Sequence, residues 1–352
     1  MKRFFLAIII LLCLGLLETV FADSLDDGYQ AFKAKDYKKA VELMRPLAEK
    51  GDPYAQDVLG FLYMGGLGVR QDLNEAARWY RKAAEQGYAN AQNNLGEMYY
   101  NGYGVSKSVT KAVEWYRKAA EQGNAEAQNN LGAMYFEGRG LKKDYDKAIQ
   151  WFLKAADQGD VHAYKNIGDA YLNGLGIPQD DNRAIEWYQK AACKGYIRAY
   201  NAIGMLYQEG RGIPKDQAEA LIWYKEAAEK GDIVAQDMLG RMYIEGDGVP
   251  KDYAEAVRWF RKAAEWGYPE VLYILSQLYI TNREGVPEDH VEMLKWAILA
   301  VDRGHEKAKE IVEVGEKALS PEQIDKAKKD AQEWADTYWK DFYPLLGTIP
   351  KP

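Results

Sequence analysis

The sequence predicts an all-α fold, a right-handed α/α superhelical solenoid assembled from helix–turn–helix repeats with a 36-residue period. Two observations support this prediction. Similar strings of alanine, glycine and aromatic residues recur along the chain, and a tryptophan marks the same place in each of them. Self-similarity at a fixed period of this length is typical of stacked units, each of which buries its apolar face only against its neighbours. The marking tryptophans, the last of which arrives one residue late, are Trp79, Trp115, Trp151, Trp187, Trp223, Trp259 and Trp296.

The first helix of each unit is predicted from one apolar stripe. In the unit that contains Trp79, apolar residues fall at i, i+3, i+4, i+7 and i+8, which places them on one helical face. This strict register assigns the tryptophans to the core. Gly87 follows the stripe, where a helix end needs a residue that tolerates positive φ. The stripe consists of Ala76, Trp79, Tyr80, Ala83 and Ala84.

A second stripe predicts the second helix of the unit, because its apolar residues are again spaced for one helical face. Gly96 on this helix has no side chain, so a neighbouring helix or its tryptophan can approach closely. Gly102 and Gly104 then form a tight turn into the next unit. The stripe consists of Ala91, Leu95, Met98 and Tyr99.

A side chain that can cap a helix stands seven residues before each tryptophan. Its oxygen can accept the free backbone N–H groups at the start of the first helix, an interaction worth about 1 kcal/mol. Asp36 extends the series to a first unit in which Leu43 replaces the tryptophan. The other predicted caps are Asp72, Ser108, Asp144, Asp180, Asp216, Asp252 and Asp289.

The predicted solenoid contains seven full units and a degenerate last one, as expected of a terminal unit that has no following neighbour to match. Ser320-Pro-Glu-Gln323 is a capping box with proline in the first turn, so it predicts the start of a final capping helix. The units are 36–71, 72–107, 108–143, 144–179, 180–215, 216–251, 252–288 and a partial unit from 289. The whole chain divides into a signal peptide at 1–22, a leading helix at 23–35, the solenoid at 36–319, the capping helix at 320–343 and a tail at 344–352.

The first residues predict a secretory signal peptide. Lys2 and Arg3 precede an apolar run from Phe4 to Leu17, which is too short for a comfortable membrane span. Small residues at the −3 and −1 positions predict cleavage after Ala22, and an uncleaved N-terminal anchor is the alternative. We therefore expect an exported protein, periplasmic or secreted, with no membrane span after cleavage. The chain has no Asn-x-Ser/Thr acceptor, which favours a bacterial envelope protein.

The composition argues against a nucleic-acid partner. The net charge of −7 becomes −8 when residues 1–22 are removed, since two basic side chains and one acidic side chain are lost. An acidic chain with dispersed basic residues has no electrostatic footprint for a nucleic-acid backbone. Only Cys193 remains after processing, so no internal disulfide can form, and its place near a helix end predicts surface exposure.

The repeated residues resemble the Sel1-like repeat family, a branch of the tetratricopeptide-like α/α solenoids. The pattern A-x-x-W-Y-x-K-A-A-x-x-G-x-x-x-A-x-x-x-L-G-x-x-Y-x-x-G-x-G-V matches almost letter for letter from Ala76 to Val105, and the resemblance covers about residues 36–310. It implies an interaction scaffold that presents a concave surface to another protein or peptide. Exported bacterial members of the family are implicated in envelope assembly, signalling regulation and contact with host proteins.

A search for catalytic chemistry gives one motif that fits an enzyme. Ser108-Val-Thr-Lys111 fits the S-x-x-K signature of penicillin-interacting serine enzymes, but Ser108 also occupies a capping position, and no S-D-N or K-T-G element accompanies it. The three histidines form no spaced ligand cluster, so we expect no metal and no small-molecule cofactor. The interpretation is therefore a non-catalytic scaffold. A penicillin-binding or penicillin-hydrolysing protein and a glycan-binding envelope protein are the alternatives.

Partner specificity should lie where the repeats differ from one another. Leu153 and Ile222 are apolar at positions beside the tryptophan that are otherwise polar. Large apolar groups on solvated helix faces are candidate interface anchors, whereas superhelical curvature could instead bury some of them against adjacent turns. Three further candidates, Tyr164, Tyr200 and Trp266, replace glutamine or lysine.

Overall fold

The computed structural model describes residues 25–339. The predicted signal peptide with its cleavage site and the predicted tail at 344–352 lie outside the described residues. The chain divides into two compact units, residues 1–179 and 180–352, and each is described by itself. Between residues 25 and 339 the structure is helical without strands, apart from an isolated bridge between Arg283 and Val286, so the predicted all-α class is confirmed.

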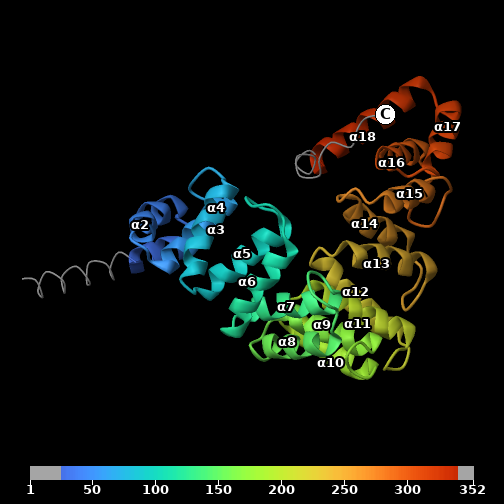
Figure 1. Cartoon of the computed structure of the whole chain (residues 1–352). Coiled ribbons are helices and arrows are strands. Elements are labelled where there is room, and N and C mark those ends of the chain that lie inside the picture. Colours follow the sequence, from blue (N-terminus) through green and yellow to red (C-terminus); the bar gives the residue numbers. More distant parts are fainter. Residues whose placement is uncertain (1–24, 340–352) are drawn as a thin grey trace, which may run out of the picture. The chain divides into compact units, whose positions relative to one another are not determined.

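The first unit is a row of paired helices (Figure 1), and each helix packs on the next one along the chain. Residues 25–33 are helical and lead into the first pair. Helices with even numbers are the first helices of the predicted repeats, and helices with odd numbers are the second. Their bounds are α2 Tyr37–Glu49, α3 Pro53–Gly65, α4 Leu73–Glu85, α5 Ala89–Asn101, α6 Val109–Glu121, α7 Ala125–Glu137, α8 Tyr145–Asp157 and α9 Val161–Asn173.

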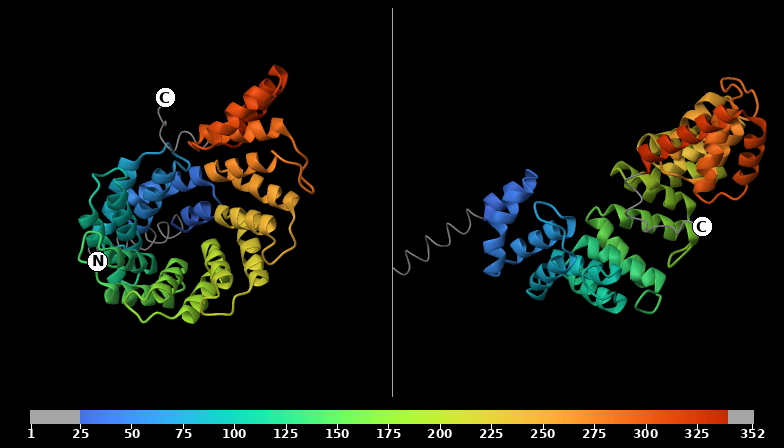
Figure 2. Two further views of the ribbon diagram at one scale, coloured as in Figure 1. Left: turned by 90° about the vertical axis from the view of Figure 1, so that its right-hand side faces the viewer. Right: turned by 90° about the horizontal axis from the view of Figure 1, so that it is seen from above.

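The second unit continues the same alternation, and the further views show its helices lying side by side in sequence order (Figure 2). Its last three helices depart from the repeat pattern. The bounds are α10 Asp181–Cys193, α11 Ile197–Glu209, α12 Gln217–Glu229, α13 Ile233–Glu245, α14 Tyr253–Ala264, α15 Pro269–Leu278, α16 His290–Asp302, α17 Ala308–Ala318 and α18 Pro321–Tyr338.

The predicted helix caps are confirmed in all eight cases. Each capping oxygen accepts a hydrogen bond from a backbone N–H in the first turn of its helix. The predicted turn glycines also adopt positive φ, for example 91° at Gly87. At Gly104, with φ 61°, an added Cβ would lie 1.9 Å from the carbonyl oxygen of Leu73, so this turn leaves no room for a side chain.

Where a helix glycine is present, the notch that it creates is filled by the aromatic residue after the tryptophan rather than by the tryptophan itself, as at Gly60, Gly96, Gly132, Gly204 and Gly240. Tyr116 of α6 is 3% exposed, and an added Cβ at Gly96 of α5 would lie 2.7 Å from its ring. Phe260 of α14 has the same relation to Gly240 of α13, with a distance of 2.5 Å. The glycine therefore sets the close packing of each odd-numbered helix against the even-numbered helix that follows it.

The sequence assigns all seven repeat tryptophans to the core. Three of them are fully buried, and four are less buried than that assignment predicts. Trp79, Trp259 and Trp296 are fully buried, whereas the tryptophans of α6, α8, α10 and α12 are only half-buried. A lysine ammonium lies over the ring of three of these four tryptophans, Trp115, Trp151 and Trp187. Lys118 Nζ, for example, lies 4.0 Å from the centroid of the Trp115 ring.

A ladder of glutamines ties neighbouring repeats together in the first unit. Gln92 donates from Nε2 to the carbonyl oxygen of Ala84, and its Oε1 accepts from Nε2 of Gln122 at 2.7 Å. The same arrangement joins Gln56 with Gln86 and Gln128 with Gln158. Gln56, Gln92 and Gln128 are buried, so each bond satisfies a polar atom that would otherwise be costly to leave without a partner.

The C-terminal helices cover the apolar face of α16. The predicted capping box formed by Ser320 and Gln323 is present, and α18 begins at Pro321, directly after Ser320. Ala327 and Ala331 of α18 are buried against the cluster that contains Trp296. In this region Ser276 and Ala297, both fully buried, replace the glycine and the aromatic ring of the other repeats, so a larger notch residue accompanies a smaller partner.

Candidate functional site

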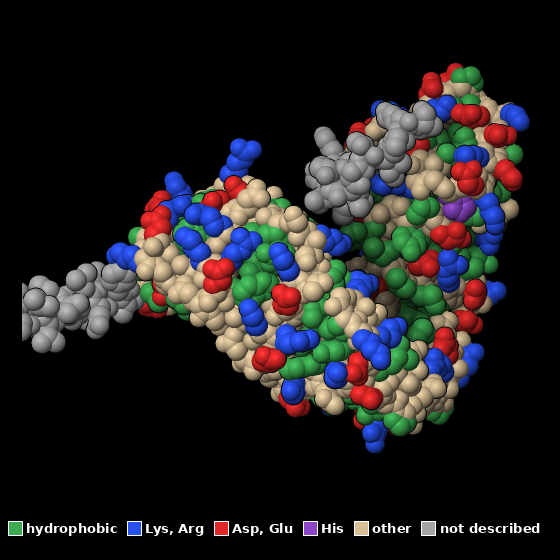
Figure 3. All heavy atoms as spheres, viewed as in Figure 1, with side chains coloured by type: hydrophobic (Ala, Val, Ile, Leu, Met, Phe, Trp, Pro, Cys, Tyr) green, Lys and Arg blue, Asp and Glu red, His purple; other side chains and the backbone are tan. Residues whose placement is uncertain are grey.

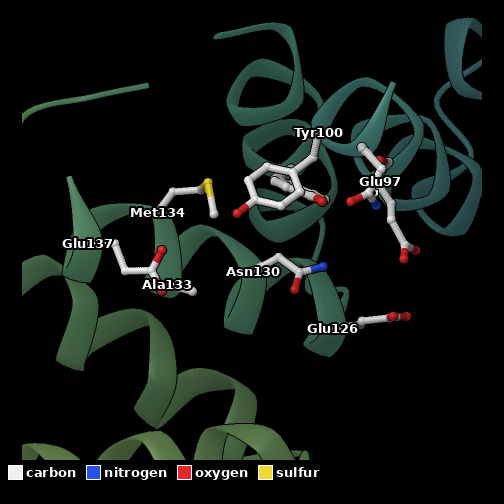
Figure 4. A pocket seen from close by; sticks show the side chains of 9 residues that line it. Glu97, Tyr100, Glu126, Asn130, Ala133, Met134 and Glu137 are labelled. Atoms are coloured by element: carbon white, nitrogen blue, oxygen red, sulfur yellow. Dashed lines mark hydrogen bonds between the residues drawn. The ribbon is translucent and has the colours of Figure 1, made fainter. Parts of the chain in front are cut away.

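A pocket of about 380 Å³ lies between α5 and α7 in the first unit, with α6 behind it (Figure 4). Helix α5 contributes Glu97 and Tyr100, helix α6 contributes Tyr116, and helix α7 contributes Glu126 and Glu137 among others. In the close-up, the Tyr100 ring lies between Glu97 on one side and Met134 on the other. The remaining lining residues are Asn101, Asn130, Ala133 and Met134. We call this the α5–α7 pocket.

The α5–α7 pocket carries an excess of negative charge. The carboxylates of Glu97 and Glu126 have no hydrogen bond and no ion pair with any described residue. Glu137 at the rim pairs with Arg139, whose guanidinium also donates to the hydroxyl of Tyr100. Three carboxylates therefore face one cation, and the cation serves only the rim.

The hydroxyl of Tyr116 is an unused hydrogen-bonding group in this pocket. The side chain is 97% buried, since only 3% is exposed, and no hydrogen bond joins its hydroxyl to any described residue. The corresponding hydroxyl of Tyr224 in the second unit donates to Oε1 of Gln208 at 2.9 Å. Tyr100 occupies the position that corresponds to Gln208, so the first unit lacks this acceptor.

Burial and neighbouring carboxylates shift the pKa values of the titratable groups in the pocket. Burial, and then the neighbouring Glu126, raise the pKa of Glu97. Burial raises the pKa of Tyr116 far above its ordinary value, so its hydroxyl keeps its proton at physiological pH.

Outside the pocket, on α3, burial raises the pKa of Asp57 to about 6, although Nδ2 of Asn94 donates to this carboxylate at 3.0 Å and opposes the shift.

Three of the five sequence-predicted partner-binding residues lie in the open. Leu153 is 39% exposed, Ile222 55% and Trp266 50%. Tyr164 and Tyr200 are half-buried. The Tyr200 hydroxyl donates to the carbonyl oxygen of Ala192 at 2.9 Å, the bond that the ladder glutamines make, and its ring packs 5.8 Å from that of Trp223. None of the five lines the α5–α7 pocket.

Trp266 interrupts the glutamine ladder. It occupies the place of Gln86, Gln122 and Gln158, so Gln236 donates to the carbonyl oxygen of Ala228 but leaves its buried Oε1 without a partner. Val234 and Tyr268, both exposed, stand at the positions that correspond to the contacting pair Tyr54 and Tyr88. An apolar patch thus surrounds a break in the repeat pattern.

The geometry around Ser108 is that of a helix cap. Its Oγ accepts from the backbone N–H of Lys111 at 3.4 Å. The Lys111 ammonium instead lies 5.3 Å from the centroid of the Tyr99 ring. A serine nucleophile needs a base within hydrogen-bond reach of its hydroxyl, and the structure pairs this lysine with an aromatic ring.

Cys193 is exposed, as its position predicts. Among residues 25–339, no group of three or more His, Cys, Asp or Glu side chains is arranged to hold a metal ion. His305 Nε2 lies 3.1 Å from Oε2 of Glu270, and its ring stacks on Tyr273. No helix in the described range is long and apolar enough to cross a membrane.

The residues of the α5–α7 pocket were not found from the sequence, although a signal existed. The position of Glu97 is occupied in the other repeats by Phe61, Ala133, Asp169, Met205, Arg241 and Gln277. Such variation between repeats marks a position that the fold does not dictate. The position of Glu97 lies on the second helix of its repeat, away from the residues beside the tryptophan at which the sequence predicted partner contacts.

The helix pairs, the caps and the glycine notches together define an α/α repeat solenoid of the tetratricopeptide-like class. The Sel1 repeat family profile matches residues 26–52, 53–88, 89–124, 125–160, 161–196, 197–232 and 233–268. The chain therefore belongs to the Sel1 repeat family. Each full match joins an odd-numbered helix with the even-numbered helix that follows, which is the pairing that the glycine notch packs most closely.

Two solved structures of the same family are similar to this chain. A Sel1 repeat protein from Oxalobacter formigenes is 41% identical, with a TM-score of 0.64, over 68% of this chain and 96% of its own. The protein c5321, described as a protective antigen present in uropathogenic Escherichia coli strains and displaying an SLR fold, is 33% identical. Its TM-score is 0.57, over 86% of this chain and 72% of its own. A comparison with curated proteins finds no match.

Proposed function

We propose that this Sel1 repeat protein is an exported, non-catalytic scaffold of the bacterial envelope or the host interface that binds a protein partner through several repeats. Proteins built from Sel1 repeats are generally protein-interaction scaffolds. The observation that carries the proposal is that each repeat separates the residues that hold the fold from the residues that are exposed. Residues that recur are buried or cap helices, whereas the exposed apolar residues occur where repeats differ. The N-terminal pattern around Lys2, Arg3 and the following apolar run supports export.

Leu153, Ile222 and Trp266 are the proposed anchors, and Tyr164 and Tyr200 are proposed to flank them. All three are large apolar side chains exposed among polar neighbours, and tryptophan is enriched among the residues that dominate binding energy at interfaces. Acidic and basic side chains are interspersed over the face seen in Figure 3, which suits a protein partner better than a polyanion. Binding through several repeats would add small contributions from each.

The test is crosslinking of tagged full-length protein in its native cells, followed by affinity capture and mass spectrometry. We expect one dominant protein partner, crosslinked to at least two neighbouring repeats. The repeats themselves supply fold-compatible substitutions for the anchors: Leu153→Arg, Ile222→Glu and Trp266→Gln, each taken from the same position of other repeats. Together they should lower the captured partner by about tenfold or more.

The matched control is Gln150→Glu, which changes the position of Ile222 in another repeat from one polar residue to another that occurs there. It should leave capture unchanged. Capture that is equal in the triple variant and the control would refute the anchors. Retention of glycan with no protein would contradict the scaffold function itself. Penicillin labelling that is lost in Ser108→Ala would contradict the absence of catalysis.

A further inference from the structure

We infer that the α5–α7 pocket binds a basic side chain, an arginine or a lysine, of the protein partner. This inference rests on the proposed scaffold function and specifies the chemistry of one contact. It is carried by two independent observations: a pocket with uncompensated carboxylates, and a buried tyrosine side chain, that of Tyr116, which lines the same pocket and whose hydroxyl has no hydrogen bond to a described residue.

The charge balance of the pocket favours a cation. Glu97 and Glu126 come from different helices, and neither has an ion pair or hydrogen bond with a described residue. Two neighbouring carboxylates in a partly buried site repel each other, and that repulsion is relieved when a cation enters between them. Arg139 is bonded to Glu137 and Tyr100, and so it leaves the half-buried Glu97 and the exposed Glu126 uncompensated.

The neutral groups of the pocket suit a guanidinium or an ammonium group. The Tyr116 hydroxyl can accept a hydrogen bond from a donor in the pocket, and the Tyr100 ring can face a cation. The chain itself uses this chemistry elsewhere. Arg81 donates from Nη2 to the hydroxyl of Tyr99 at 3.1 Å, and Arg261 donates to that of Tyr279 at 2.9 Å.

The size and the arrangement of the pocket point to a side chain rather than a bare metal ion. Within residues 25–339 the acidic groups do not form a cluster of three that could coordinate a metal. A volume of about 380 Å³ also exceeds the space that an ion needs, and it lies within the range of roughly 300–1,000 Å³ that is usual for organic ligands. Met134 and Ala133 provide an apolar wall for the aliphatic stem of a long basic side chain.

The experiment is an NMR titration of the full chain, labelled with ¹³C at the methionine methyl groups, with the peptide acetyl-Gly-Gly-Arg-Gly-Gly-amide. Met134 lines the pocket and reports binding there. We expect a saturable shift of the Met134 methyl signal with the arginine peptide and with its lysine counterpart. The citrulline peptide has nearly the same shape without the charge, and it should bind at least about tenfold more weakly.

The variants assign the binding to named groups. Glu97→Gln and Glu126→Gln should each weaken the arginine peptide by about tenfold, and Tyr116→Phe by several-fold. Phenylalanine occurs at the position of Tyr116 in two other repeats, as Phe152 and Phe260, so this variant should fold. Glu75→Gln is the control, because Glu75 pairs with Arg78 away from the pocket lining, and it should bind like the wild type.

Three results would overturn the inference: no saturable shift of Met134, equal binding of the citrulline peptide, or wild-type binding in Glu97→Gln and Glu126→Gln. None of them bears on the capture of a partner by the exposed anchors. Conversely, a basic peptide that binds the pocket while cells yield no protein partner would leave the pocket chemistry standing and refute the scaffold function.

Discussion

Each of the two units has a pocket at the same place in the repeat, and the two pockets are lined by different residues. Four repeats after the α5–α7 pocket, a pocket of about 250 Å³ lies between α13 and α15, and we call it the α13–α15 pocket. At corresponding positions, Arg241 replaces Glu97 and Phe260 replaces Tyr116, and other lining residues also differ between the two pockets. The other corresponding pairs are Tyr100 and Ile244, Asn130 and Ile274, and Met134 and Leu278.

The two pockets share the residues that the fold needs and differ in the residues that we propose to contact a partner. Both pockets keep an aromatic ring against a helix glycine, at Gly96 in one and at Gly240 in the other. The hydroxyl of Tyr116 has no counterpart in the second pocket, and the carboxylate of Glu97 is replaced there by the guanidinium of Arg241, which pairs with Asp237 at 3.0 Å. Glu245 is the carboxylate that lines the second pocket. A repeat scaffold can therefore vary its recognition chemistry at fixed backbone positions while the notch holds the helices together.

The largest expected effect comes from removing the aromatic ring that both pockets place against a helix glycine. Tyr116→Ala and Phe260→Ala should each destabilise the surrounding repeats by about 3–5 kcal/mol, because both empty the notch beside a glycine. Tyr116→Phe should cost less than about 1 kcal/mol, since the ring remains. Hydrogen exchange of α5 and α6, or of α13 and α14, measures the local effect. Equal losses in Tyr116→Ala and Tyr116→Phe would contradict the division between ring and hydroxyl.

A second prediction concerns the buried carboxylate on α3. Asp57→Asn should stabilise the first unit by about 1–3 kcal/mol at pH 7, because burial raises the pKa of Asp57 to about 6 and the charged form is therefore disfavoured in the folded state. Asparagine occupies the corresponding positions 93 and 129, and it preserves the acceptor for Asn94.

The pH dependence fixes the sign of that effect. The folded-state pKa lies above the ordinary value of 3.8, so the wild type loses stability through this group as the pH rises from about 4 to about 6. The advantage of Asp57→Asn should therefore be full above pH 6 and vanish near pH 4. Chemical denaturation of both proteins across this range measures the difference, and an advantage that persists at pH 4 would rule out the electrostatic cause.

The third prediction sharpens the contrast in charge between the pockets. Affinity of the α5–α7 pocket for the arginine peptide should fall as the pH is lowered, and the fall should begin at a higher pH than an ordinary glutamate would give, because burial and the neighbouring Glu126 raise the pKa of Glu97. The peptide keeps its charge throughout. Glu126, Glu137, Arg139, Tyr100 and Tyr116 also face the pocket. In Glu97→Gln the dependence should be flatter, and an unchanged slope would assign the titration to another group.

The smallest expected effect concerns the second unit. Trp266→Gln should raise stability by about 1 kcal/mol, because the new amide can donate to the buried Oε1 of Gln236 as Gln86, Gln122 and Gln158 do to their partners. Thermal unfolding measures it, with Trp266→Ala as the control that removes the indole without supplying a donor. A stability gain of the same size in Trp266→Ala would show that the indole itself is unfavourable there.

The fold could be predicted from the sequence because the same helix caps, turn glycines and apolar positions recur in successive repeats. The caps from Asp36 to Asp289 and the turn glycines needed only local rules, and the structure confirms them. The core was predicted less well, since periodicity cannot tell which of two adjacent rings faces the notch. Tyr116 does so, and Trp115 remains half-buried.

The α5–α7 pocket could not be predicted in the same way. Glu97 and Glu126 belong to different helices, and they meet only because α5 and α7 pack with α6 behind them. The unmade bond of Tyr116 is likewise a property of packing, because Tyr224 has the same local sequence position and finds an acceptor in Gln208. Positions that vary between repeats could have been named from the sequence, but not which of them share a pocket.

Charge reversal at one residue tests the central claim most directly. Glu97→Arg introduces the residue that the corresponding position of the second unit already carries as Arg241, so the helix should tolerate it. Titration with the arginine peptide, followed at the Met134 methyl group, should show no saturable binding to this variant, while Glu75→Gln binds as the wild type does. Undiminished binding of the arginine peptide to Glu97→Arg would contradict the account, because the carboxylates of the α5–α7 pocket would then not be what recognises the cation.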